Sequence, residues 1–558
     1  MFSKFVVIIC VIFINSCRSE QSATYTAAVV EINPVSDGNT SKSVAKLTKQ
    51  AIDIIESSVL DGVDIVVLPE VLFNRQNTAV LLPNTNLSYC DDPTVDEVLR
   101  SVSCAVRKAK KYVVIDLYVK VKCSMDDQSF CAYESDSTNL YNMAIVFDRN
   151  GDVVTKYRKY HLFGEYGAQQ TQTPDMTTFK TDFNVTFGVC VCFDLFFDEP
   201  AINLVDQGVK HFVYPTKWYS EIPYLTAVQY QQSWAYANNV NLLAANVNAP
   251  SIKCSGSGIY GGRSGALQVI VSESPATQIL IAKIPIDPLP AEHYSSKIDK
   301  ATEGNRLSRS FLQLETDSDE INFGNFVENS LNFSNSNIQP GDVPFEMNLK
   351  QENLIEFTVT FLNFSESLKQ SGTVCNKAIC CDYNIEVSDN GELDGKSSYS
   401  YAISVFSGHR YHNPIKNLLT GQEMCSLIAC TEMNTKSSCG IRTSPSQVHN
   451  RYNFIKLLLK TVLPVTRMKV MPNTLTADLL PLKVTEFEYK ISELKEHYAV
   501  ELNLNVPKSN LLTFAIFSRD YDKDMITNGA ESGKSFIIIT FCVFSSIIWM
   551  RYSHYVNH

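Results

Sequence analysis

The sequence is short of features that assign many proteins to a class. It has no low-complexity tract, and no apolar run reaches the ~20 residues of a membrane-spanning helix. Apart from the pair Cys190 and Cys192, no Cys/His cluster has the spacing of a zinc site, so we expect no metal cofactor. Basic residues are outnumbered, 48 against 59 acidic ones, and the net charge of −11 gives no reason to expect a nucleic-acid partner.

Two apolar runs that are too short to span a membrane lie near the ends of the chain. Residues 1–19 combine Lys4, the apolar run Phe5–Ile14 and small polar residues, which predicts a secretory signal peptide. Residues 528–558 hold small residues, a polar spacer and the apolar run Phe536–Met550, which together predict a removed GPI-attachment signal with Asn528 as the candidate attachment residue. A short single-pass anchor is the alternative, and both predict a tether outside the cell.

A secreted chain passes through an oxidising, glycosylating compartment, which changes how two other patterns are interpreted. We expect glycosylation at the five Asn-x-Ser/Thr triplets, which begin at Asn39, Asn86, Asn184, Asn332 and Asn363. Six clustered cysteines predict disulfides whose pairing the sequence leaves open: Cys375, Cys380, Cys381, Cys425, Cys430 and Cys439. Cys123 and Cys131 flank a short polar loop and are a further candidate pair.

Residues 24–290 alternate between strand and helix patterns, which is typical of sheets covered by helices. Helices are predicted over 41–60, 95–110 and 223–238, and strands over 24–32, 63–68, 112–119, 140–147, 152–157, 210–214, 241–247, 267–271 and 278–284. Residues 291–320 are polar and irregular, as in a linker. Residues 321–524 predict a smaller, mostly β domain, with strands over 354–362, 378–387, 399–406, 487–491, 499–506 and 511–518.

The stretch Phe187–Asp198 suggests a nucleophile. An apolar run with β-branched residues ends at Cys192, and polar residues that could open a helix follow. A thiol at such a strand-to-helix turn faces backbone N–H groups and the positive end of a helix dipole, which would lower its pKa. A disulfide or a Cys-x-Cys metal pair are the alternatives for this cysteine in isolation.

Two charged residues upstream also sit where buried strands are predicted to end. Glu70 follows the apolar run Ile65–Leu68 and Pro69, and Lys159 lies in a segment whose basic residues are interleaved with Tyr, Leu and Phe. Taken alone, Glu70 could be an exposed loop residue and Lys159 part of a solvated basic turn. Taken together with Cys192, they offer a general base, a compact positive charge and a nucleophile.

The order of these motifs resembles the nitrilase, or carbon–nitrogen hydrolase, superfamily, and within it the vanin and biotinidase branch. The resemblance rests on Leu68-Pro69-Glu70, Arg158-Lys159-Tyr160-His161-Leu162-Phe163, Cys192-Phe193-Asp194-Leu195-Phe196-Phe197, Tyr214-Pro215-Thr216-Lys217-Trp218, Leu242-Leu243-Ala244-Ala245-Asn246 and Cys380-Cys381. It implies an α/β fold, an αββα nitrilase sandwich followed by the β-rich domain, which would pack on the sandwich and shape the mouth of the site.

The resemblance also implies an amidase without cofactor, in which Glu70 is the general base, Lys159 the oxyanion stabiliser and Cys192 the nucleophile. Glu165 matches a second glutamate found in many members and would support Lys159 or the substrate; a surface loop residue is the alternative. The implied substrates are small-molecule amides, either pantetheine, cut to pantothenate and cysteamine, or biotinyl amides. A catalytically silent, anchored binding or adhesion protein is the competing hypothesis, and the presence of all three residues argues against it.

Overall fold

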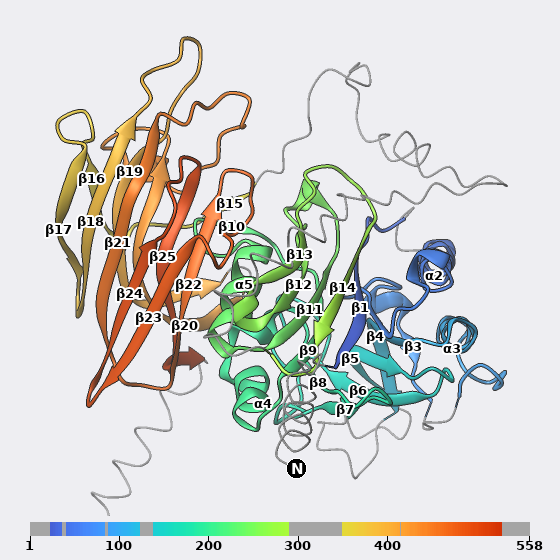
Figure 1. Ribbon diagram of the computed structural model, residues 1–558. Coiled ribbons are helices and arrows are strands. Elements are labelled where there is room, and N and C mark those ends of the chain that lie inside the picture. Colours follow the sequence, from blue (N-terminus) through green and yellow to red (C-terminus); the bar gives the residue numbers. More distant parts are fainter. Residues whose placement is uncertain are drawn as a thin grey trace, which may run out of the picture.

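Two sheets packed face to face form the first half of the protein (Figure 1). The computed structural model describes residues 23–35, 41–83, 88–122, 138–288, 349–412 and 415–526. The first sheet has the order β14 (Gln278–Pro285), β1 (Thr24–Glu31), β2 (Ile65–Val67), β4 (Tyr112–Lys122), β5 (Thr138–Phe147) and β6 (Val153–Arg158), with β3 (Val80–Leu81) beside β4. The second has the order β13 (Ala266–Ile270), β12 (Ser257–Gly261), β11 (Asn241–Asn246), β9 (His211–Thr216), β8 (Thr186–Val189) and β7 (Thr178–Lys180).

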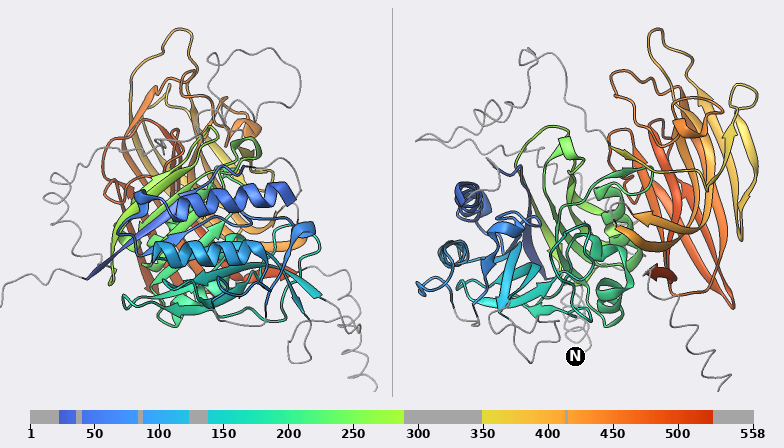
Figure 2. Two further views of the ribbon diagram at one scale, coloured as in Figure 1. Left: turned by 90° about the vertical axis from the view of Figure 1, so that its right-hand side faces the viewer. Right: turned by 180° about the vertical axis from the view of Figure 1, so that it is seen from behind.

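Strands of the first sheet are apolar on both faces because both faces are covered. In β1, Ala27 and Val29 belong to the core between the two sheets. The alternate residues Ala28 and Val30 pack into a second core with helices α2 (Ser41–Ile55) and α3 (Glu97–Ala109). Figure 2 shows these two helices side by side on the outer face of the sheet. The continuous apolar runs of the sequence are therefore explained by a layer on each side.

Helix α5 (Ala227–Asn238) lies against the second sheet on one side and the second domain on the other. Nine of its 12 residues are buried, so it does not show the single apolar stripe of a surface helix. Thr226 and Gln229 form a capping box at its N-terminus, which fixes where the helix begins. The short α4 (Asn203–Asp206) precedes β9.

Residues 349–526 form a sandwich of two five-stranded sheets around their own apolar core. One sheet has the order β16 (Thr358–Leu362), β19 (Ser400–His412), β20 (Ile415–Cys430), β25 (Leu511–Ile526) and β22 (Met468–Thr476). The other has the order β17 (Lys369–Asn376), β18 (Ile379–Asp389), β21 (Tyr452–Pro464), β24 (His497–Leu504) and β23 (Phe487–Leu494). Two short strands, β10 (Glu221–Ile222) and β15 (Lys350–Gln351), pair across the two domains.

The six clustered cysteines are disulfide-bonded, as predicted, and their pairs are Cys375–Cys380, Cys381–Cys425 and Cys430–Cys439. The first domain adds a pair that the sequence did not suggest, Cys90–Cys104, which joins α3 to the segment before it. Cys123 and Cys131 lie outside the described residues.

The predicted fold class is confirmed, whereas several boundaries were wrong. The helix predicted over 41–60 ends at residue 55 and is followed by a separate turn, η1 (Ser58–Leu60), and the one predicted over 223–238 begins at 227. The strand predicted over 354–362 begins at 358, and β7, β12, β17, β20, β21 and β22 were not predicted. The predicted signal peptide, linker and C-terminal signal fall outside the described residues. Among the residues that are described, no helix is long and apolar enough to cross a membrane.

Candidate active site

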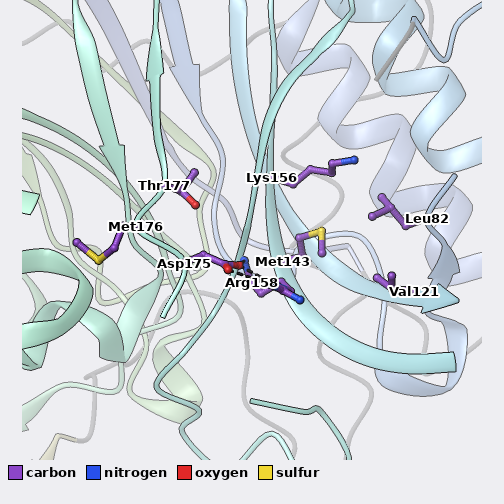
Figure 3. Close-up of a pocket in the computed structure, with 8 residues that line it drawn as sticks. All are labelled: Leu82, Val121, Met143, Lys156, Arg158, Asp175, Met176 and Thr177. Atoms are coloured by element: carbon purple, nitrogen blue, oxygen red, sulfur yellow. Dashed lines mark hydrogen bonds and ion pairs between the residues drawn. The ribbon is translucent and has the colours of Figure 1, made fainter. Parts of the chain in front are cut away.

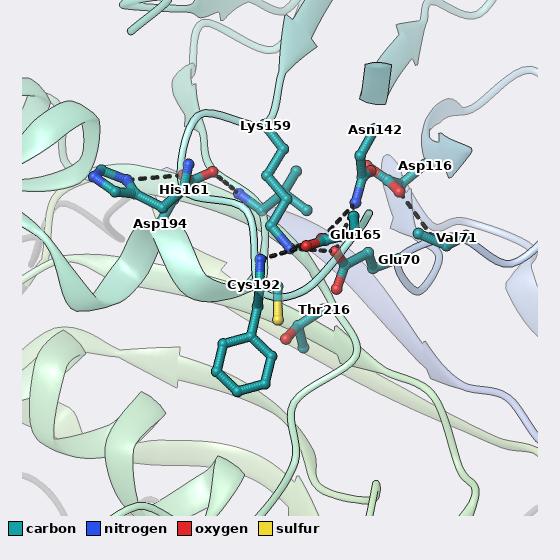
Figure 4. Close-up of polar contacts among 12 residues, drawn as sticks. Glu70, Val71, Asp116, Asn142, Lys159, His161, Glu165, Cys192, Asp194 and Thr216 are labelled. Atoms are coloured by element: carbon teal, nitrogen blue, oxygen red, sulfur yellow. Dashed lines mark hydrogen bonds and ion pairs between the residues drawn. The ribbon is translucent and has the colours of Figure 1, made fainter. Parts of the chain in front are cut away.

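Glu70, Lys159 and Cys192 follow three different strands and meet at one end of the two sheets (Figure 4). Glu70 follows β2, Lys159 comes directly after β6, and Cys192 lies just beyond β8. All three are buried, with 2%, 2% and 5% of their surface exposed. The alternatives of an exposed loop glutamate and a solvated basic turn are therefore wrong.

Lys159 is enclosed by two carboxylates. Its Nζ donates to Glu70 Oε1 at 2.7 Å and also to Glu165 Oε1. Burial opposes the charged form of Lys159, but Glu165 and Glu70 outweigh it and raise the lysine pKa well above its usual value. Burial likewise disfavours the Glu165 carboxylate, yet Lys159 lowers its pKa. Lys159 is thus an ammonium held in place, and Glu165 contacts it rather than lying on the surface.

Cys192 occupies a tight turn at the start of η3 (Cys192–Phe196), with a left-handed φ of 47°. The Tyr214 hydroxyl donates to the Cys192 carbonyl at 2.6 Å, which helps to hold this uncommon backbone conformation. The Thr216 side chain and the Lys217 backbone favour the charged form of the sulfur and so act to lower its pKa. A second sulfur, Cys190, is also buried and free.

The expectation of a lowered thiol pKa at Cys192 was wrong. Burial, with the negative charge of Glu70, raises the pKa of Cys192 well above its usual value, although Lys159, the Thr216 side chain and the Lys217 backbone act in the opposite direction. The predicted helix is one short 3₁₀ turn, which offers little dipole to compensate for desolvation. Cys192 is consequently a thiol at rest, and it could act as a nucleophile only after losing its proton.

Asp194 ties the turn at Cys192 to the segment that carries Lys159. Its Oδ2 accepts from the Tyr157 hydroxyl at 2.7 Å and the Val191 N–H at 3.0 Å, and its Oδ1 accepts from the His161 N–H at 2.8 Å. The carboxyl group is fully buried. Asp194 therefore fixes the two segments relative to each other. A clue was present in the sequence, because an aspartate inside the apolar run Phe193–Phe197 requires buried partners.

Asn142 and Asp116 are two further polar residues that sequence reasoning missed. Asn142 Nδ2, on β5, donates to Glu70 Oε1 at 2.8 Å and to Glu165 Oε1 at 3.3 Å. Asp116, on β4, accepts from the Val71 N–H at 2.8 Å through Oδ1. Each interrupts an otherwise apolar strand, and that interruption was the available signal.

Aromatic rings surround the turn at Cys192. Phe193, next to Cys192, packs edge-on against Phe163 at 4.9 Å, and Phe163 stacks on Tyr219 at 6.1 Å between ring centres. The second domain contributes His412, whose ring lies 5.4 Å from that of Phe193. Tyr219 keeps 39% of its surface exposed. The second domain therefore contacts, through His412, the residue next to Cys192.

A separate surface pocket of about 460 Å³ lies beside β6 (Figure 3). Its lining includes Lys156, Arg158 and Asp175, and Asp175 binds the Arg158 guanidinium through two hydrogen bonds of 2.9 Å. None of Glu70, Lys159 and Cys192 lines it. This pocket is therefore distinct from the candidate active site.

The predicted glycosylation and lipid-attachment sites lie away from the candidate active site or outside the described residues. Asn184 is exposed in the turn between β7 and β8, and Asn363 is half-buried at the end of β16. Asn39, Asn86, Asn332 and Asn528 fall outside the described residues. Within the described ranges, no group of three or more His, Cys, Asp or Glu side chains could hold a metal ion.

Comparison with known proteins assigns the two domains. The carbon–nitrogen hydrolase family model matches residues 26–284, and the model of the vanin C-terminal domain matches residues 347–524. The first match defines the class of protein as a carbon–nitrogen hydrolase. Vanin-like protein 1 of Drosophila melanogaster is 34% identical over 528 residues, which cover 90% of this chain and 87% of the relative. The chain belongs to the vanin branch of the nitrilase superfamily.

More distant relatives carry names that describe activities. Human pantetheinase is 27% identical, with 92% of both chains covered, and mouse biotinidase is 29% identical, with 74% of this chain and 80% of that protein covered. A nitrilase-superfamily protein of Saccharomyces cerevisiae with a solved structure is 18% identical and covers 51% of this chain and 96% of its own, at a TM-score of 0.36. The disulfides and the vanin relatives are consistent with a secreted or extracellular protein.

Proposed function

We propose that the protein is an amidohydrolase that cleaves a linear amide through a thioester on Cys192, with pantetheine as its substrate. The observation that carries this proposal is the buried cluster in which Lys159 contacts Glu70 beside Cys192. An anchored binding protein would have no need for a buried lysine between two carboxylates, since such a cluster costs desolvation energy. The geometry thus favours an enzyme over a catalytically silent adhesion protein.

The reaction begins with removal of the thiol proton. Because the pKa of Cys192 is raised, Glu70 takes the proton as the sulfur attacks the amide carbonyl carbon. The carbonyl oxygen becomes an oxyanion, which the Lys159 ammonium and backbone N–H groups stabilise. The carbon–nitrogen bond then breaks, and the protonated Glu70 gives its proton to the leaving amine.

The second half hydrolyses the thioester. Glu70, again a carboxylate, takes a proton from a water molecule that attacks the thioester carbonyl. The second tetrahedral intermediate collapses with loss of the Cys192 sulfur, which recovers a proton from Glu70, and the carboxylic acid leaves. Glu165 and Asn142 hold Lys159 and Glu70 through both halves without reacting.

Pantetheine is favoured over a biotinyl amide by the extent of the similarity. The human pantetheinase match covers 92% of this chain, including the second domain, whereas the mouse biotinidase match covers 74%. The test is turnover of pantetheine and biocytin by the same purified protein, with Cys192→Ala as the blank. We expect a kcat/KM for pantetheine at least about tenfold higher, which corresponds to ~1.4 kcal/mol of differential transition-state binding. Preference for biocytin would overturn the proposal that pantetheine is the substrate. Hydrolysis of neither amide would overturn the proposal that the protein is an amidohydrolase.

We further propose that a GPI anchor attached at Asn528-Gly529-Ala530 holds the enzyme outside the cell. The sequence supports this, since Phe536–Met550 is too short to span a bilayer but apolar enough to be retained until transamidation. Phosphatidylinositol-specific phospholipase C should release active protein that lacks residues 536–558. A peptide containing Trp549, recovered from mature surface protein, would instead demonstrate a retained transmembrane tail.

A further inference from the structure

Two buried polar atoms beside the candidate active site have no hydrogen-bond partner among the described residues, Asp116 Oδ2 and Asn142 Oδ1. Their residues lie on adjacent antiparallel strands, where Asp116 is opposite Ala144 and Asn142 is opposite Tyr118. Both side chains therefore project from the same face of the sheet, one diagonal step apart. Figure 4 draws Asp116 beside Asn142, next to the group formed by Glu70, Lys159 and Glu165.

The partners already assigned restrict what these two atoms can do. Asn142 Nδ2 donates to the Glu70 and Glu165 carboxylates, which fixes the amide orientation and leaves Oδ1 able only to accept. Asp116 Oδ1 accepts from the Val71 N–H. A hydrogen on Asp116 Oδ2 that is donated to Asn142 Oδ1 would satisfy both unpartnered atoms, whereas an ionised Asp116 would leave two buried acceptors without a donor.

The surrounding charges favour the same protonation state. The charged groups that face Asp116 are Glu70 at the end of β2, Lys159 after β6 and Glu165 in the following loop. An ionised Asp116 would place three carboxylates around one ammonium. Burial, with the charge of Glu70, raises the pKa of Asp116 well above its usual value, and the Val71 N–H and Lys159 only partly offset this.

We propose that Asp116 is a neutral carboxylic acid whose Oδ2–H donates to Asn142 Oδ1, and that it is a positioning residue for Glu70. This inference rests on the proposed role of Glu70 as the general base. Asn142, locked by Asp116, holds Glu70 Oε1 next to Lys159, so that the other carboxylate oxygen is available to the Cys192 thiol. Asp116 thereby keeps the Glu70 carboxylate in position without contacting the substrate.

Two variants of similar size separate the hydrogen-bond role from simple packing. Asp116→Asn keeps a donor for Asn142 and an acceptor for the Val71 N–H, whereas Asp116→Leu has neither. We expect Asp116→Leu to lower kcat about 10- to 100-fold with little change in KM, because the base loses its alignment, and Asp116→Asn to stay within about threefold of wild type. Equal loss in both folded variants would overturn the proposal.

The pH profile gives a readout that packing would not move. As the pH rises through the raised pKa of Asp116, the donor is lost and a negative charge appears beside Glu70, so wild-type kcat should fall on the alkaline side. Lys159 is not expected to cause this fall, since its own pKa is raised. Asp116→Asn cannot ionise and should lack the fall. An alkaline fall that this variant retains unchanged would overturn the assignment.

Infrared difference spectroscopy without substrate tests the proton itself. The wild type minus Asp116→Asn spectrum should contain the carbonyl band of a protonated carboxylic acid. The matched control Asp175→Asn removes an aspartate that is paired with Arg158, and should lose only carboxylate bands. Absence of the acid band in an active wild type would overturn the Asp116 proposal but not the proposed function. An acid band in a protein that hydrolyses no amide would instead refute the proposed function.

Discussion

At the scale of single residues, the site combines groups whose protonation is set by burial and close partners. Lys159 stays charged because two carboxylates compensate for its desolvation, while Cys192 stays neutral because nothing nearby compensates fully for its own. The proposed mechanism therefore requires a proton transfer from Cys192 to Glu70 rather than a preformed thiolate. A pKa lowered by a helix N-terminus, as the sequence suggested, would have implied the opposite.

The two buried thiols should behave differently. Cys192→Ala removes the proposed nucleophile and should abolish amide hydrolysis. Cys190→Ala should retain most of it, because Cys190 lies in the apolar core, where it packs as a small hydrophobe. The measurement is kcat on the amide substrate, with circular dichroism to verify the fold. Equal loss in both folded variants would contradict the assignment of the nucleophile.

Lys159→Arg should not preserve activity. The ammonium sits 2.7 Å from Glu70 Oε1 in a fully buried site, and a planar, bulkier guanidinium cannot place one compact charge there. We expect a loss of kcat of about 100-fold or more, comparable with the removal of an oxyanion donor. Steady-state kinetics at saturating substrate measures it. Near-normal turnover by the arginine variant would remove Lys159 from the mechanism.

At the scale of elements, the site depends on how the exits of β2, β6 and β8 are held together. Asp194 joins two of these exits through three hydrogen bonds, and Asn142 on β5 reaches the third through Glu70. The site is therefore supported by the rigid sheets rather than by its own loops, which suits a reaction that needs reacting atoms aligned closely.

Asp194→Asn should weaken this junction. The amide has one oxygen, so either the Tyr157 and Val191 donors or the His161 donor must face an N–H group. We expect a loss of about 1–3 kcal/mol in the free energy of unfolding, together with a fall in kcat of about tenfold or more. Thermal unfolding and steady-state kinetics on the same sample give both values. A variant that loses stability but keeps wild-type kcat would show that Asp194 does not align the site.

How far the sequence predicts these elements depends on where their polar residues find partners. Strands with unbroken apolar runs, such as Ile65–Val67, were predicted, and so was the place of Glu70, Lys159 and Cys192 after strand ends. β20 was missed because Gln422 and Glu423 interrupt its pattern; both are buried, and their partners Arg410 and Lys523 come from other strands. Asp116 and Asn142 were missed as site residues because their partners, Val71 and Glu70, come from another part of the chain.

Two other errors have local causes. β22 contains Pro472 and Asn473, which disfavour a strand, and the proline is tolerated because β22 pairs with a single neighbour at the sheet edge. The start of α5 was placed four residues early because the capping box at Thr226 and Gln229 was not recognised. The disulfide pairs could not be predicted from the sequence, since strand register brings Cys375 to Cys380 and the packing of two sheets brings Cys381 to Cys425.

At the scale of the whole molecule, the second domain helps to complete the catalytic one. Buried polar contacts cross between them: Gln229 Nε2 donates to Asn473 Oδ1 at 2.7 Å, and the Tyr224 hydroxyl pairs with that of Ser426 at 2.8 Å. Arg519, fully buried, donates to the Phe196 carbonyl at 2.9 Å, in the same turn as Cys192. The Arg519 guanidinium thereby joins the second domain to the turn that contains Cys192.

These contacts predict that the two domains unfold together. A catalytic domain that had lost its partner would expose the buried faces of α5 and leave polar groups such as the Phe196 carbonyl without partners. Calorimetry with disulfides intact should therefore show one transition, with equal calorimetric and van't Hoff enthalpies, that coincides with the loss of activity. Two separated transitions would mean that the interface is not essential to either domain.

Arg519→Met should move this single transition without splitting it. The substitution leaves Asp524 without its cation and the Phe196 carbonyl without its donor, so we expect the free energy of unfolding to fall by about 3–5 kcal/mol. The control Lys490→Met removes an exposed partner of Glu488 in the second domain and should leave the transition where it is. If Arg519→Met instead produced an early transition that abolished activity while the second domain remained folded, Arg519 would support only the turn at Cys192, and the coupling between the domains would have to lie in α5.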